Sequence, residues 1–177
     1  MAPTPQKDQR IGIFIDIQNL YHSAKNLYGG RVNYTELMRQ LVGDRRLVRA
    51  IAYVVKSDPS TGEESFFDAL EKAGIELRSK DIQVWADGSK KADWDVGMAV
   101  DAIRVADMVD VVVLATGDGD FVPLVEYLKW GLGRNVEVAG FGRTTSSMLR
   151  GVAEVFHDIE KMPRVVFKSM KRTRRDL

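Results

Sequence analysis

The sequence contains no cysteine among its 177 residues. This absence excludes disulfide bonds and thiolate zinc sites, and it fits a cytoplasmic protein. No apolar run approaches the roughly 20 residues that a membrane-spanning helix requires, and the polar residues 1–10 lack the apolar stretch of a signal peptide. With 45% hydrophobic and 29% charged residues, the chain is expected to form a globular cytoplasmic domain with no membrane partner.

Two glycine motifs that bind nucleotides are also missing. A dinucleotide-binding domain needs a three-glycine turn after its first strand, whereas the turn after the first apolar run reads Asp16-Ile17-Gln18-Asn19-Leu20. No glycine-rich turn ends in Gly-Lys-Ser or Gly-Lys-Thr, which excludes a P-loop. The sequence therefore argues against both of these nucleotide-binding folds.

The net charge of +1 hides an uneven distribution. Residues 161–177 hold seven Lys or Arg and one Asp, a surplus of six positive charges, so the rest of the chain carries a net charge of −5. A basic segment on an acidic body can attract a phosphate polymer, and a solvated chain end explains the segment equally well. The expected organisation is a disordered lead at 1–10, a single domain at 11–160 and a basic C-terminal tail at 161–177.

Apolar runs alternate with helix-like periodicity along the chain. Strands are predicted at residues 11–15, 47–55, 75–79, 82–85, 109–115, 135–139 and 154–159, the last of them at a sheet edge. Helices are predicted at residues 17–28, 33–42, 63–73, 93–107, 122–130 and 145–149. This alternation predicts an α/β fold, a three-layer α/β/α sandwich with a mainly parallel sheet.

Two carboxylates follow the strand at 109–115, in the turn Thr116-Gly117-Asp118-Gly119-Asp120-Phe121. Ligands bind outside the carboxyl ends of strands in open α/β sheets, and carboxylates a few ångströms apart raise each other's pKa or need a cation. Alternatively, Asp118 caps the next helix and Asp120 is a favourable acid in its first turn. Two acids on a glycine turn after a buried strand favour a functional role.

Further polar residues are expected at the same edge of the sheet. Asp16 ends the first strand, and Asn19 lies in the first turn of the helix after it. The helix at 93–107 runs antiparallel to the strand that follows, so Asp95 in its first turn can face this edge. Asp101 lies about 9 Å further along the helix, which favours a role in helix packing.

The helix at 93–107 also has an apolar stripe that is expected to face the core, formed by Val96, Ala99, Val100, Ile103 and Ala106. The three tryptophans, Trp85, Trp94 and Trp130, can stack on nucleic-acid bases. Core or partial burial is the expected position for each of them.

Oxygen ligands of this kind suit Mg²⁺ or Mn²⁺. A divalent ion bound to them can activate water and neutralise charge on a phosphoryl oxygen. His22 and His157 are expected at the surface or in packing, so no zinc site is predicted. The predicted metal ligands are Asp16, Asp95, Asp118 and Asp120.

Two other segments can contact a phosphate. Arg143, Thr145 and Ser146 lie where the loop after the strand at 135–139 opens a short helix, and amides and hydroxyls at a helix start can hold a phosphate. An ordinary loop with a Thr or Ser cap explains the same residues. Lys91, next to Lys90 and just ahead of Asp95, can steer a nucleic-acid backbone, although such lysine pairs are commonly solvated.

The acidic segments together resemble the NYN domains, in the LabA-like branch of the PIN-like nuclease superfamily. The matching segments are residues 14–20, 90–96 with 99–102, and 116–124, and the likeness runs from about 11 to 159. The resemblance implies a PIN-like, Rossmannoid sheet, a divalent metal at the acidic cluster and cleavage of RNA phosphodiesters. The catalytic residues that it implies are Asp16, Asn19, Asp95, Asp118 and Asp120.

Some details of the match remain open in the sequence. Asp93 is an alternative to Asp95, and Asp101 also fits the family pattern. Thr116 stands where the family often has serine and keeps the hydroxyl group.

These observations lead to the hypothesis of a metal-dependent endoribonuclease acting on single-stranded RNA. The expected substrate contacts are Lys91, Thr116, Arg143, Thr145 and Ser146. One alternative is a non-catalytic regulatory module of the same fold that binds RNA, a nucleotide or a protein, and another is a metal-dependent phosphatase of small phosphoesters. A homodimer is compatible with the sequence, which does not specify an oligomeric state.

Overall fold

The computed structural model describes residues 6–56 and 63–169, without the side chains of residues 90 and 91. Six strands form one sheet in the order β4-β3-β1-β7-β8-β9, and every neighbouring pair is parallel. They are β1 (Arg10–Asp16), β3 (Arg46–Lys56), β4 (Glu76–Asp81), β7 (Val111–Ala115), β8 (Asn135–Gly140) and β9 (Val155–Asp158). The strand predicted at 154–159 is therefore an edge strand, as expected.

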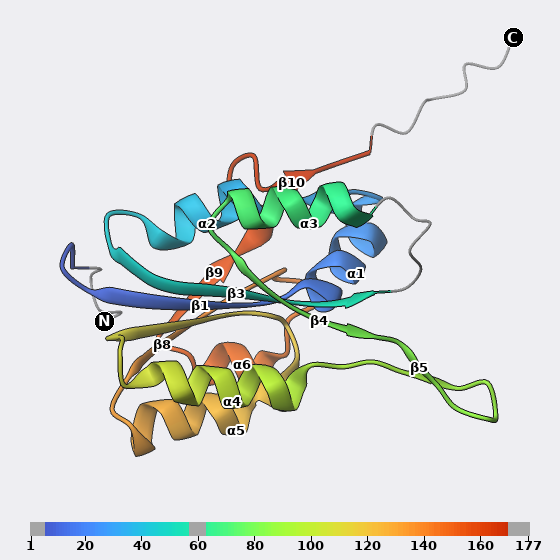
Figure 1. Cartoon of the computed structure of the whole chain (residues 1–177). Helices are drawn as coiled ribbons and strands as arrows, with labels where there is room; N and C mark the ends of the chain where they lie inside the picture. The colour runs from blue at the N-terminus through green and yellow to red at the C-terminus, as the bar shows by residue number, and fades with distance from the viewer. Residues whose placement is uncertain (1–5, 57–62, 170–177) are drawn as a thin grey trace, which may run out of the picture.

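Helices cover both faces of this sheet (Figure 1). One face carries α1 (Ile17–Tyr28), α2 (Tyr34–Val42) and α3 (Glu63–Lys72). The other carries α4 (Asp95–Ala106), α5 (Val122–Glu126) and α6 (Ser147–Val152). A 3₁₀ turn, η1 (Gly119–Phe121), leads into α5, and a π-helical turn, η2 (Tyr127–Gly131), follows it. The predicted three-layer α/β/α sandwich is confirmed.

The two cores follow from the alternation of side chains along the buried strands. Ile11, Ile13 and Ile15 of β1 belong to the cluster beneath α1, α2 and α3, whereas Phe14 belongs to the cluster beneath α4, α5 and α6. Successive side chains of a strand point to opposite faces, so a continuous apolar run fills both layers at once.

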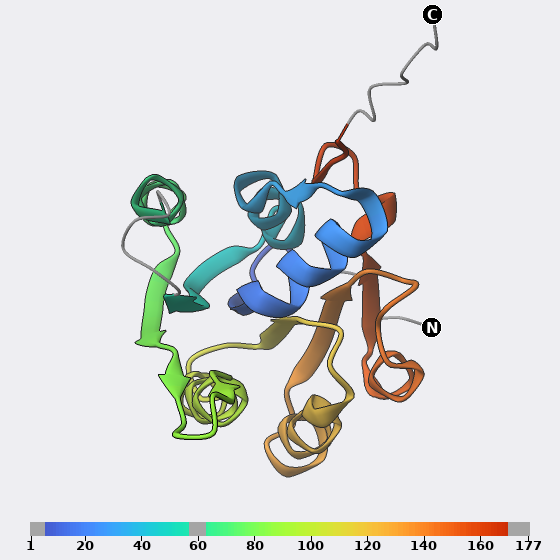
Figure 2. The same ribbon diagram turned by 90° about the vertical axis from the view of Figure 1, so that its right-hand side faces the viewer.

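The chain changes direction across the sheet between β1 and β7. From β1 it builds outward through β3 to β4, then returns to the other side of β1 and builds outward through β7, β8 and β9. Such a reversal leaves a crevice at the carboxyl ends of the two central strands, where ligands bind in folds of this class. Figure 2 views the molecule from this end, with α1 in front.

Outside the main sheet, β5 (Gln83–Val84) and β6 (Lys90–Lys91) form a small antiparallel hairpin. The hairpin extends away from the body of the molecule at the end of the sheet where α1 begins (Figure 1). Among the described residues, no helix is long and apolar enough to cross a membrane.

The predicted apolar stripe of α4 is wrong for three of its five residues. Val96 is 75% exposed, and Val100 and Ile103 are also exposed. Ala106 is buried as predicted, and Ala99 is partly buried against the same core. The other side chains of α4 that pack there are Met98, Ala102 and Val105. Val96, Ala99 and Ile103 line a shallow apolar groove together with Pro123 and Tyr127.

The tryptophan prediction also fails for two of the three residues. Trp130 is 82% exposed and Trp85 is 57% exposed, because Trp130 lies on the outer side of η2 and Trp85 follows the projecting strand β5. Trp94 is partly buried as expected, and its indole N–H donates to the carbonyl oxygen of Val54 at 2.9 Å.

Part of the segment predicted as a basic tail, from residue 161, packs against the domain. After the 3₁₀ turn η3 (Ile159–Lys161), the chain forms β10 (Val166–Phe167), which pairs antiparallel with β2 (Arg31–Val32). Val165 is fully buried, and its carbonyl oxygen accepts from the backbone N–H of Asn33 at 2.7 Å. Residues 162–167 therefore belong to the fold, and residues 170–177 of the predicted tail lie outside the described part of the chain.

We expect Val165→Ala to lower the free energy of unfolding by about 1–2 kcal/mol, since it removes two buried methyl groups from the core. The matched control is Val84→Ala, because Val84 is 64% exposed in the hairpin and surface substitutions usually change stability by less than about 0.5 kcal/mol. Urea denaturation measures both variants. Equal stability of the two would show that the segment before β10 does not contribute to the core.

Candidate functional site

Four aspartates meet at the crevice between β1 and β7. Asp16 is the last residue of β1, Asp118 and Asp120 follow β7, and Asp95 is the first residue of α4. Ile15 pairs with Ala115 in the parallel register, so the two strands end side by side. Asp95, Asp118 and Asp120 each offer one carboxylate oxygen, and these three oxygens lie within 4.8 Å of one another. We call these three residues the acidic triad.

Asp95 rather than Asp93 joins the triad. Because α4 runs antiparallel to β7, its first turn reaches the carboxyl end of that strand, and Asp95 opens this turn. Asp93 lines the adjacent cleft. Asp101 lies outside the triad, where its carboxylate accepts from the Tyr53 hydroxyl at 2.9 Å and lies 3.5 Å from Arg78. The expected packing role of Asp101 therefore agrees with its contacts.

The hydroxyl of Thr116 links the two central strands. It donates to Oδ2 of Asp16 at 3.1 Å and accepts from the backbone N–H of Asp118 at 3.2 Å. Asp118 in turn caps η1, because its Oδ1 accepts from the backbone N–H of Asp120 at 2.9 Å. The capping role considered for Asp118 therefore exists, and it leaves the second carboxylate oxygen for another partner.

Asp16 and Asn19 make a second link across the crevice. Oδ1 of Asp16 caps α1 by accepting from the backbone N–H of Asn19 at 3.1 Å. The side-chain oxygen of Asn19 accepts from the backbone N–H of Gly117 at 2.8 Å. The start of α1 is therefore tied to the turn after β7, which fixes the positions of Asp16 and Asp118 relative to each other.

Burial and mutual repulsion disturb the ionisation of these acids. Burial, followed by the charges of Asp118, Asp16, Asp93 and Asp120, raises the pKa of Asp95 to about 6. Burial also raises the pKa of Asp16, against the lowering effect of its hydrogen bonds from Asn19 and Thr116. No Lys or Arg is found among the described residues that line the cleft. Like charges at this spacing need a proton or a cation between them.

The donor set fits a hard divalent cation. Carboxylate oxygens with space for water are the ligands that Mg²⁺ and Mn²⁺ accept. Asp95, Asp118 and Asp120 could hold such an ion together, and Asp16 lies in the same cleft as Asp95 and Asp118.

A cleft of about 420 Å³ opens beside the acids, a volume in the range of small-molecule sites. The lining residues that the sequence analysis did not assign to the site are Gln18, His22, Ser23, Asn26, Tyr53, Val55, Trp94 and Thr144. Gln18, His22 and Asn26 follow the helical spacing i, i+4, i+8, which in retrospect is the sequence signal for one face of α1. His22 was expected at the surface or in packing, and it is exposed on this cleft.

Two of the hydroxyls predicted to bind substrate are buried and already bonded within the protein. Thr116 is fully buried, and its hydroxyl is used by Asp16 and Asp118. The buried hydroxyl of Thr145 donates to the carbonyl oxygen of Phe141 at 2.8 Å. A side chain on Gly140 would collide with this hydroxyl, so only glycine allows the close approach. Both hydroxyls therefore have structural partners within the protein, and the direct substrate contacts of Thr116 and Thr145 stay predictions.

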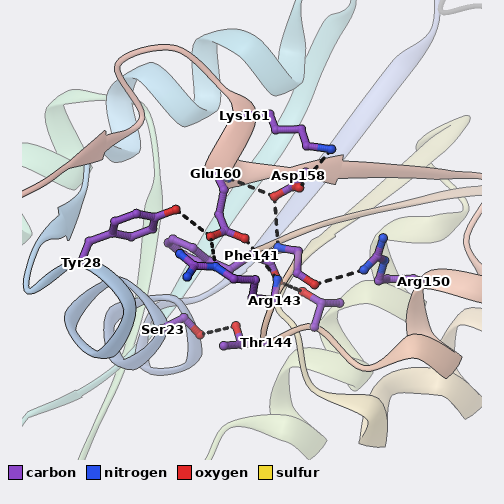
Figure 3. A network of polar contacts seen from close by, with 11 residues as sticks. Ser23, Tyr28, Phe141, Arg143, Thr144, Arg150, Asp158, Glu160 and Lys161 are labelled. Atoms are coloured by element: carbon purple, nitrogen blue, oxygen red, sulfur yellow. Dashed lines mark hydrogen bonds and ion pairs between the residues drawn. The ribbon is translucent and has the colours of Figure 1, made fainter.

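The predicted phosphate loop is an ordinary loop held by carboxylates (Figure 3). Asp158 accepts from the backbone N–H of Gly142 at 3.0 Å, and Glu160 accepts from that of Arg143 at 3.1 Å. The Nε of Arg143 also donates to Glu160, at 2.7 Å. Since carboxylates already occupy these two amides, the loop is not a preformed phosphate site.

The remaining predicted contacts are placed as follows. Ser146 caps α6 by accepting from the backbone N–H of Leu149 at 3.4 Å, and its own N–H donates to the carbonyl oxygen of Gly117. Ser146 therefore connects the start of α6 to the turn that carries Asp118 and Asp120. The side chain of Lys91 lies outside the described part of the structure, and its backbone belongs to β6. His157 is a packing residue as expected, since it hydrogen bonds Glu137 at 2.8 Å.

The crowding of the acids predicts a gain of stability for Asp95→Asn. A raised pKa in the folded state means that stability is present at low pH and is lost as pH rises through about 6. In the presence of a chelator at pH 7.5, the variant should be more stable than the wild type by about 1 kcal/mol, after allowance for partial exposure. This corresponds to a melting temperature about 2–4 °C higher.

Calorimetry at pH 7.5 and pH 4.5 measures this effect, and the advantage should shrink at the lower pH, where Asp95 is mostly protonated in the folded protein. The control is Asp107→Asn, since the Asp107 side chain is 85% exposed just beyond the other end of α4. An Asp95→Asn variant no more stable than this control at pH 7.5 would show that the acids do not repel one another.

Removal of the Thr116 hydroxyl should weaken both the fold and its hold on a divalent ion. Thr116→Val leaves Asp16 and the Asp118 amide without their buried partner, at an expected cost of about 1–3 kcal/mol. Loss of a group that orients ligands typically weakens metal affinity by about 10-fold or more. Thr116→Ser keeps the hydroxyl and should retain both properties. Isothermal titration with Mn²⁺ compares the three proteins, and equal affinity of the valine variant would contradict the orienting role.

Comparison with known proteins agrees with this geometry. The chain is 28% identical over 131 residues to "Low amplitude and bright protein LabA" of Synechococcus elongatus, a match that covers 70% of this chain and 69% of LabA. Its fold is similar to the crystal structure of VPA0982 from Vibrio parahaemolyticus, a protein of unknown function, with a TM-score of 0.84 and 32% identity. That match covers 93% of this chain and all of VPA0982. The model of the NYN domain matches residues 10–160, and the chain therefore belongs to the NYN domain family.

Proposed function

We propose that the protein is a metal-dependent ribonuclease that hydrolyses phosphodiester bonds of single-stranded RNA at the acidic triad and Asp16. The observation that carries the proposal is the convergence of three carboxylates within 4.8 Å at the crevice, with no Lys or Arg among the described residues of the adjoining cleft. Protein groups of one sign are held together here, and a divalent cation would balance their charge. The NYN family, which belongs to the PIN-like nucleases, supports a nuclease reading.

The ligands of the proposed site are Asp16, Asp95, Asp118 and Asp120, and the expected ion is Mg²⁺ or Mn²⁺. When bound, the ion supplies positive charge that lowers the pKa of water and offsets negative charge on the phosphoryl oxygens. The contribution of the protein is to hold the carboxylates in place. Thr116, Asn19 and the cap on η1 fix the acids before any substrate arrives, and such preorganisation avoids a reorganisation cost during the reaction.

A second function follows if the site binds without turnover. Both oxygens of Asp16 and one oxygen of Asp118 already accept hydrogen bonds within the protein. The acidic arrangement is therefore maintained by the fold itself, which also suits a regulatory module that binds RNA, a nucleotide or a protein. The two functions share the site and differ only in whether a bond is broken.

The test is the double variant Asp118→Asn, Asp120→Asn. Cleavage of a labelled single-stranded RNA in Mn²⁺ should fall by at least about 100-fold, since two of the proposed ligands are lost. The melting temperature in chelator should be no lower than that of the wild type, because the variant relieves repulsion. Asp107→Asn serves again as the matched Asp-to-Asn control and should keep full activity.

Two outcomes decide between the proposed functions, and a further substrate defines the mode of cleavage. Undiminished cleavage by the double variant overturns the nuclease proposal. Binding of Mn²⁺ and RNA by a wild type that does not cleave supports the regulatory module. A circular single-stranded RNA as substrate decides between endonuclease and exonuclease, because it has no ends.

A further inference from the structure

The cleft beside the acidic triad has a wall of a different chemical kind. Gln18, His22 and Asn26 lie one turn apart along α1 and line the same cleft as Asp16, Asp95 and Asp118. All three are exposed, whereas the opposite face of α1 is buried through Ile17, Leu20 and Ala24. The cleft therefore presents acids on one part of its lining and carboxamide and imidazole groups on another.

These three side chains of α1, which we call the α1 wall, have hydrogen-bonding capacity that the fold does not use. Among the described residues, the side chains of Gln18, His22 and Asn26 make no hydrogen bond to another residue. Their neighbours are used, since Asn19 holds Gly117 and Ser23 bonds the hydroxyl of Thr144 at 3.0 Å. The three unused side chains thus share the face of α1 that lines the cleft.

Two aromatic residues, the buried Tyr53 and the partly buried Trp94, also line the cleft. Tyr53 and Trp94 pack with their ring centroids 5.5 Å apart. The Tyr53 hydroxyl donates to Asp101 and the Trp94 indole donates to Val54, so the rings are fixed and both donors are taken. Tyr53 is only 1% exposed and the ammonium group of Lys80 lies 4.7 Å from the centre of the Trp94 ring, so this pair is a rigid part of the lining and not a surface for base stacking.

The phosphate and the base of a bound nucleotide would therefore lie at different parts of the cleft. A phosphate finds no Lys or Arg among the described lining residues, so its place is at the acids with their divalent ion. A base is uncharged and carries donors and acceptors at its edge, which carboxamides match with one donor and one acceptor each. Cleft size also fits one nucleotide of a single strand, whose base edges are free to be read.

We propose that Gln18, His22 and Asn26 read the base next to the phosphate held at the acidic triad, so that the protein selects RNA by base identity. The inference rests on the proposed function for the position of the phosphate. It assigns α1 the role of specificity determinant and leaves the acids their role in the reaction.

The experiment compares the wild type with Gln18→Ala, Asn26→Ala, His22→Ala and the double variant Gln18→Ala, Asn26→Ala. Each protein cleaves four ribohomopolymer oligonucleotides of equal length in Mn²⁺, and kcat/KM is measured for each. The wild type should prefer one base. In the double variant, the ratio between the most and least preferred polymer should fall by about 10-fold, the loss expected for a two-point base contact.

Lys25→Gln is the control, because Lys25 is exposed on α1 but does not line the cleft. It should leave the ratio between polymers unchanged. An unchanged ratio in the double variant overturns the inference, as does an equal loss of activity on all four polymers, since a solvated helix face or a general binding surface would not distinguish bases.

Binding separates this inference from the proposed function. The Asp118→Asn variant and its combination with Gln18→Ala and Asn26→Ala are titrated with the same four oligonucleotides in Mn²⁺, followed by fluorescence anisotropy. Base-dependent affinity that the added substitutions abolish supports the α1 wall even if the wild type cleaves nothing. If the wild type cleaves RNA but neither binding nor turnover depends on the base, base reading by the α1 wall is overturned and the ribonuclease proposal stands.

Discussion

Parallel pairing of β1 with β7 is the constraint on which the site depends. The pairing joins segments 100 residues apart, so that Asp16 and Thr116 become neighbours at the ends of adjacent strands. Parallel strands end at the same edge of a sheet, and the reversal of strand order at this point leaves room above them. Like charges would separate if they were on flexible segments, but here the hydrogen-bonded sheet and the buried Thr116 hydroxyl hold them together. The fold thus supplies the free energy that a repulsive arrangement costs.

The same strand order occurs in dinucleotide-binding proteins. Numbered in chain order, the six strands of the main sheet follow 3-2-1-4-5-6, which is the Rossmann order. Topology alone would therefore not exclude a pyrophosphate ligand. The difference lies in the two turns at the crevice, where Asp16 and Asp118 stand in place of glycine-rich backbone. Anionic side chains there repel a bare phosphate, so the identity of a few turn residues decides which chemistry the common scaffold serves.

Much of this arrangement could be predicted from the sequence because it follows from local rules. Asp16 and Asp118 end apolar runs, and Asp95 opens a helix that must run back along the next strand, so their convergence follows from α/β topology alone. The face of α4 could not be predicted, because the helix carries two apolar stripes and only the sheet decides that Met98 and Ala102 pack inward while Val96 remains outside. Hydrogen bonds between residues distant in sequence, such as that from Thr116 to Asp16, could not be predicted either. The wall formed by Gln18 and Asn26 became visible only once the cleft was described.

The return of the chain through β10 changes how the charge of the C-terminal region is to be counted. Arg164 lies 3.6 Å from Glu36, Lys161 lies 3.7 Å from Asp158, and the ammonium group of Lys168 lies 4.9 Å from the centre of the Tyr28 ring. Three of the seven basic side chains after residue 160 are thus partnered within the domain itself. A shortened chain ending at residue 160 would lose these intramolecular partners and Val165 along with any capacity of the end to attract polyanions. Loss of RNA binding by such a truncation would therefore report on the folded domain as much as on electrostatic attraction.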